Sequence, residues 1–145
     1  MHGTDNGGIG AAADPARTRL AAVGAMVVTA GAGLGLRAVA AGSVAKFGGD
    51  ALYTVLIQAL VVLIVPRVRP VTAAGSALVV SWVVEFLQLS EVPAELSERS
   101  SVARLVLGST FNPPDLFWYG VGAAAGWLVH TALNSFLSRR HTGRD

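Results

Sequence analysis

The chain has 145 residues, enough for one domain, and 52% of them are hydrophobic while only 14% are charged. Soluble domains carry about 25% charged residues, so this composition and a mean hydropathy of +0.55 indicate a membrane protein. The lack of cysteine excludes disulfides and thiolate chemistry. The net charge of +2 does not gather in a basic run interleaved with aromatic residues, so nucleic acid is not an expected partner.

The N-terminal part combines a polar tail with a first apolar run. Residues 1–16 are rich in Gly, Ala and Asp, which predicts a disordered tail. Two arginines then precede the uncharged residues 20–36, which cross most of a hydrocarbon core of about 30 Å at about 1.5 Å per residue. A cleaved signal peptide is the alternative, but Arg37 and the long tail favour a retained helix.

Three more apolar runs follow, at residues 51–65, 71–89 and 116–137. The first two are separated by the basic, helix-breaking turn 66–70. A polar loop at 90–101 precedes the segment 102–111, which is too short to span and is expected to be interfacial or re-entrant.

These runs predict an all-α, polytopic membrane protein. Its four-transmembrane-helix bundle covers residues 17–138, the short interfacial or re-entrant segment lies between the third and fourth helices, and 139–145 form a basic tail.

The distribution of Lys and Arg predicts the orientation. Four spans place both termini and the 66–70 turn on one side, which holds seven of these residues against four on the other. The positive-inside rule then predicts a multi-pass protein of the inner (plasma) membrane with both termini cytoplasmic.

Two glycine pairs have the spacing of close helix contacts. These are Gly31-xxx-Gly35 in the first run and Gly122-xxx-Gly126 in the fourth. Because Gly and Ala are abundant in this chain, a chance spacing is the alternative for either pair.

Glu85 is the most informative polar residue. It lies about 21 Å from the inner end of the third run, at about 1.5 Å per residue, where a charge is costly. Gln88 at i+3 and Ser81 at i−4 share its helix face, which should therefore point into the bundle. A carboxylate tied to a loop arginine for packing is the alternative to a functional site.

Two other acids are expected at the same membrane face. Taken alone, Asp50 is explained as a helix N-cap and Asp115 as an acid in the first turn of a helix. Their convergence with Glu85 from three separate helices favours a shared site instead. Lys46 is a further possible counter-charge. The candidate polar cluster comprises Asp50, Glu85, Gln88, Asp115, Tyr119, Arg99 and Arg37. No metal spacing occurs among the three histidines, so neither a metal nor a cofactor is expected.

Three stretches resemble a known family: "KFGGDALY" (46–53), "EFLQ" (85–88) and "LGSTFNPPDLFWYGVG" (107–122). They resemble the bacterial membrane family called domain of unknown function 2809 and, more distantly, the VanZ-like family. The resemblance implies a four-helix inner-membrane protein and, by association only, a cell-envelope role. It also implies an arginine in the loop after Gln88, for which Arg99 is the best match. The positions that it marks are Gly49, Asp50, Glu85, Gln88, Gly108, Phe111, Asp115, Tyr119 and Gly122.

Two classes of function remain open. The first is a binding or stabilising module whose polar cluster holds a lipid head group, an envelope precursor or another membrane protein within the lipid bilayer. The second is a small enzyme or proton-coupled transporter that uses Glu85. The sequence has neither inverted repeats nor a nucleophile with its base, which favours the first class.

Overall fold

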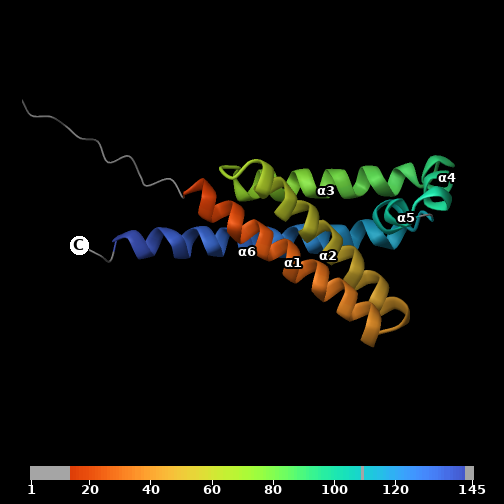
Figure 1. The fold of residues 1–145 in the computed structure, drawn as a ribbon, viewed down its shortest axis with the longest axis horizontal. Helices are drawn as coiled ribbons and strands as arrows, with labels where there is room; N and C mark the ends of the chain where they lie inside the picture. Colours follow the sequence, from red (N-terminus) through yellow and green to blue (C-terminus); the bar gives the residue numbers. More distant parts are fainter. Residues whose placement is uncertain (1–13, 109, 143–145) are drawn as a thin grey trace, which may run out of the picture.

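The computed structural model describes residues 14–108 and 110–142, and this part of the chain is all-α (Figure 1). Four of its helices are long and apolar enough to cross a membrane by length and composition, namely α1, α2, α3 and α6. The six helices are α1 (Pro15–Val39), α2 (Gly42–Ile64), α3 (Pro70–Leu87), α4 (Val92–Arg99), α5 (Ser101–Leu107) and α6 (Pro113–Thr142).

Proline and capping side chains set several helix starts. The Asp14 carboxylate accepts a hydrogen bond from the Ala16 N–H at 3.0 Å, and Pro15 occupies the first turn of α1. Pro70 has the same role in α3, after the 66–70 turn. The expected N-terminal tail therefore gives way to helix at Pro15, and residues 1–13 lie outside the described part. At the other end, α6 continues to Thr142, through positions expected in the basic tail.

The second helix begins earlier than the apolar run suggested. α2 starts at Gly42, so Asp50 lies two turns inside the helix and is not its N-cap. The glycines of "KFGGD" do not interrupt the helix, and they give it a surface without side chains. A side chain at Gly48 would collide with Leu36 of α1, so this glycine lets α1 and α2 pack closely.

The connection between α3 and α6 is more ordered than a polar loop. It contains α4 and α5, which pack against each other. Pro93 falls in the first turn of α4, and the Ser100 hydroxyl caps α5 by accepting from the Ala103 N–H at 3.3 Å. The prediction of a loop at 90–101 is therefore wrong: most of this segment is the helix α4, and Ser100 separates it from α5.

α2 is the central helix of the molecule. It packs against α1, α3 and α6, whereas α1 packs mainly on α2, and α3 also packs on α6. Figure 1 shows α3 and α6 running side by side, with α4 and α5 gathered at the end where they join. The α1–α2 hairpin crosses this pair obliquely, so its connecting end diverges from α4 and α5.

The interior combines small apolar residues with several polar side chains, and the exterior is apolar. The largest fully buried side chains in the described residues are Glu85, Thr54 and Ser81. The Thr54 and Ser81 hydroxyls lie 3.0 Å apart, linking α2 to α3, and Ser81 also donates to the Ala77 carbonyl at 2.9 Å. Large aliphatic side chains face outward along all four long helices. A bilayer favours this arrangement, because polar groups within lipid must find partners inside the protein.

The two glycine pairs differ in their surroundings. A Cβ at Gly122 would collide with the backbone of Ala51, so α6 and α2 approach each other there as only glycine allows. Gly126, one turn later, lies against the Gln58 side chain. Gly31 and Gly35 have no atom within 4 Å of an added Cβ, so the spacing in α1 makes no close contact within the described residues.

Candidate functional site

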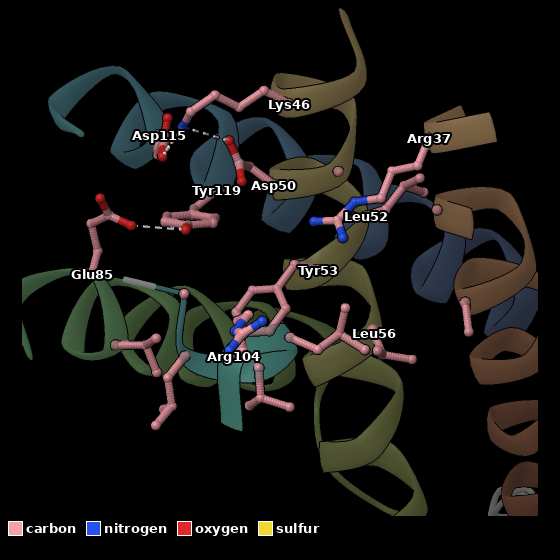
Figure 2. Close-up of a pocket in the computed structure, with 18 of the residues that line it drawn as sticks. Arg37, Lys46, Asp50, Leu52, Tyr53, Leu56, Glu85, Arg104, Asp115 and Tyr119 are labelled. Atoms are coloured by element: carbon pink, nitrogen blue, oxygen red, sulfur yellow. Dashed lines mark hydrogen bonds and ion pairs between the residues drawn. The ribbon is translucent and has the colours of Figure 1, made fainter. Parts of the chain in front are cut away.

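Glu85 is held by two hydrogen bonds from other parts of the chain. It is 1% exposed near the end of α3. Its Oε1 accepts from the Asn112 backbone N–H at 2.7 Å, and its Oε2 accepts from the Tyr119 hydroxyl at 2.9 Å (Figure 2). Both donors belong to the start of α6 or the residue just before it, so this carboxylate joins the end of α3 to the beginning of α6.

The other two acids share one lysine. The Lys46 ammonium of α2 donates to Asp115 Oδ2 and lies 3.8 Å from Asp50 Oδ2. Asp115 is 4% exposed and also accepts a hydrogen bond from the Asn112 side-chain amide. Asp50, Glu85 and Asp115 therefore meet at one end of the bundle, with Lys46 as the cation that contacts two of them.

Gln88 and Gly108 lie together beside this group. The Gln88 amide donates to the Leu107 carbonyl and thereby fixes the end of α5 against the end of α3. Gly108 has a φ of +64°, a left-handed conformation that favours glycine, and an added Cβ would also crowd Gln88. Phe111 stacks on Phe86 of α3, with 6.0 Å between the ring centroids. These contacts hold the α5–α6 connection over Glu85.

A cavity of about 490 Å³ lies beside the polar cluster. Its wall comes from α1, α2, α3, α5 and α6, where α1 and α2 diverge from the rest. The volume lies within the range of about 300–1,000 Å³ typical of small-molecule sites. Gly49 is on the wall and has open space beyond its Cα. The polar or charged lining residues are Thr29, Arg37, Lys46, Asp50, Tyr53, Glu85, Gln88, Arg104, Thr110, Asp115 and Tyr119.

Three arginines lie near this end of the bundle, all of them exposed, and two of them line the cavity. Arg37 of α1 and Arg104 of α5 line the cavity, and Figure 2 shows both guanidinium groups directed into the space beside Tyr53. Arg104 also donates to the Ser97 carbonyl at 3.1 Å. Arg99 is exposed at the end of α4 and is not part of the cavity wall, so the expected loop arginine is replaced there by Arg104.

Most of the expected cluster is therefore brought together, and two contributions were not foreseen. Asn112 supplies a backbone donor to Glu85, and Arg104 takes the place expected for Arg99. Lys46, expected as one of several possible counter-charges, is the cation that contacts the acids. Lys46 had a visible signal, since it precedes Asp50 by one helical turn. Across residues 14–108 and 110–142, no group of three or more His, Cys, Asp or Glu side chains is placed to hold a metal ion.

The helix arrangement and the sequence comparisons identify the class of protein and its family. Four long apolar helices that bury several polar side chains between them support a membrane-embedded helical protein. The chain belongs to the family described as Protein of unknown function (DUF2809), whose sequence model matches residues 39–123, more than half of its length. No curated protein and no solved structure matches the chain.

Proposed function

We propose that the chain is a four-span inner-membrane protein whose cavity binds an amphipathic ligand taken from the bilayer. The single observation that carries the proposal is the cavity itself, which places charged groups beside aliphatic ones. Arg37, Asp50 and Arg104 contribute the polar wall, and Leu34, Leu52, Leu56 and Leu105 are among the apolar lining residues. A ligand with a charged head and an apolar body matches such a surface, and lipids or lipid-linked envelope precursors have this form.

The proposed orientation places this cavity at the outer membrane face. The seven-to-four distribution of Lys and Arg supports cytoplasmic termini, so the ends of α2 and α6 that carry Asp50 and Asp115 face outward. α4 and α5 then lie on the outer side as the interfacial segment. A cell-envelope role and a distant VanZ-like relationship belong to the same proposal.

The bonding of Glu85 favours binding over proton chemistry. Both of its carboxylate oxygens already accept hydrogen bonds from the protein, which suits a residue that holds α3 to α6. Each carboxylate oxygen keeps a second acceptor site, but at 1% exposure Glu85 has little contact with water from which to take a proton. Within the proposal, Glu85 therefore shapes the wall of the site, and no reaction is assigned to it.

A pair of glycines in α1 allows a matched test. Gly33 lines the cavity, whereas Gly31 is exposed and lies outside its wall, and an added Cβ at either position meets no atom within 4 Å. Gly33→Phe should fill the cavity and reduce the lipid that co-purifies with the protein about tenfold, a loss of about 1.4 kcal/mol in binding. Gly31→Phe should retain as much lipid as the wild type.

Native mass spectrometry after extraction in a mild detergent measures the bound lipid directly. Equal thermal unfolding of the two variants would show that both are folded. Equal lipid retention by both variants would contradict the cavity as the binding site, as would a wild-type protein that carries no bound lipid.

A further inference from the structure

Two buried acceptors on the cavity wall lack a hydrogen-bond donor within the described residues. These are Asp50 Oδ2 and Gln88 Oε1. The Lys46 ammonium lies 3.8 Å from the Asp50 oxygen, beyond hydrogen-bonding distance, because it donates to Asp115. Gln88 uses its amide nitrogen on Leu107, which leaves its oxygen unpaired. Buried acceptors without donors are costly, so these two favour a ligand that donates hydrogen bonds.

Two guanidinium groups on the same cavity are cationic hydrogen-bond donors. Neither Arg37 nor Arg104 has a carboxylate within 4.0 Å in the described part of the chain, although several acids are nearby. Those acids are already engaged, Glu85 with Tyr119 and Asp115 with Lys46. A guanidinium presents a planar set of donors that matches the oxygens of a phosphate group. The arginines therefore favour a ligand that also carries an anion.

We propose that the ligand is a phospholipid whose head group carries a primary ammonium. Its phosphate lies against Arg37 and Arg104, and its ammonium donates to Asp50 and Gln88. The glycerol and the start of the acyl chains pack on the aliphatic lining residues of α1 and α2. This inference rests on the proposed function, because it requires that the cavity binds a lipid at all.

The ammonium distinguishes this ligand from two common alternatives. An anionic phospholipid without an amine would satisfy the arginines and leave both acceptors without a charged donor. A choline head group has the phosphate, but its quaternary nitrogen has no hydrogen to donate. A preference for the primary amine over choline is therefore the signature of this site. One charge-assisted hydrogen bond corresponds to a preference of about tenfold.

The test is a competition in native mass spectrometry. Purified protein is mixed with equal amounts of phosphatidylethanolamine, phosphatidylcholine and phosphatidylglycerol that have identical acyl chains. The wild type should retain phosphatidylethanolamine about tenfold better than either other lipid. Asp50→Asn should reduce it to the level of phosphatidylcholine, whereas Glu95→Gln, at an exposed acid of α4 outside the cavity, should leave the preference unchanged. Arg37→Gln and Arg104→Gln should weaken the retention of all three lipids.

The outcomes separate this inference from the function on which it rests. If Gly33→Phe excludes lipid but the wild type holds the three lipids equally, the cavity binds lipid and the head-group assignment is wrong. A preference for phosphatidylglycerol or phosphatidylcholine overturns the assignment in the same way. If no lipid is retained by the wild type, both proposals fail.

Discussion

Gly122→Ala is expected to destabilise the protein by about 1–3 kcal/mol, the usual cost of overpacking a close contact. The new Cβ would collide with the backbone of Ala51, so α6 and α2 would have to separate along their contact. A backbone cannot move aside as a side chain can. Gly126→Ala should therefore cost less, because its new methyl group meets the flexible side chain of Gln58.

Gly120→Ala is the matched control for this series. It lies on the same helix, two residues earlier, and an added Cβ there has no neighbouring atom within 4 Å. Its stability should equal that of the wild type or exceed it by up to about 1 kcal/mol in thermal or denaturant unfolding in detergent micelles, because Ala favours the helix more than Gly does. Similar stability losses for Gly120→Ala and Gly122→Ala would contradict the close packing of α2 on α6.

Glu85→Ala is expected to have the largest effect of any single substitution at the site, about 2–6 kcal/mol, because two buried donors lose their acceptor at about 1–3 kcal/mol each. It leaves the Asn112 N–H and the Tyr119 hydroxyl without their acceptor in a buried position. Tyr119→Phe removes one of the two bonds and should cost about 1–3 kcal/mol. Glu85→Gln should cost less than alanine, because its amide oxygen can still accept from Asn112 and its amide nitrogen can donate to the Tyr119 oxygen.

Unfolding of these variants in the same detergent checks the ranking, with Glu95→Ala as the control. Glu95 is exposed on α4, and such surface changes stay within about 0.5 kcal/mol. A Glu85→Ala protein as stable as this control would mean that the two hydrogen bonds do not hold α3 to α6. If Glu85→Gln keeps stability and bound lipid but loses a measured proton flux, the transporter alternative would replace the binding proposal.

The long helices could be predicted from the sequence because lipid imposes a minimum apolar length on each. The residues at which these helices begin and end were harder to predict. α2 starts at Gly42 and continues through the glycines before Asp50, and of these Gly48 packs against α1, a relation that no local pattern reveals. The helix α4 was missed because its residues are polar and its apolar content is low, although Pro93 and Ser100 are ordinary signals for helix ends.

The acidic residues of the site were predictable from the sequence, whereas their hydrogen-bond partners were not. The cost of placing Glu85 in lipid indicated that it must face inward, and helix direction indicated that Asp50 and Asp115 lie at the same end. Its actual partners depend on tertiary geometry: one is the backbone N–H of Asn112, which carries no sequence signal. Arg104 faces the cavity because the chain breaks at Ser100 and starts a new helix, so spacing along the sequence could not select it over Arg99.

The central claim is a cavity that opens at the outer end of a four-span bundle, and single-cysteine labelling tests it most directly. The chain has no cysteine, so each introduced thiol reports alone. Gly49→Cys lines the cavity and fits into open space, whereas Arg67→Cys lies in the turn between α2 and α3, at the opposite end of α2.

A membrane-impermeant maleimide added to intact cells should modify Gly49→Cys, and it should reach Arg67→Cys only after the membrane is opened. The reverse pattern, with Arg67→Cys modified in intact cells and Gly49→Cys protected until the membrane is opened, would contradict the proposed orientation and the outward-facing cavity.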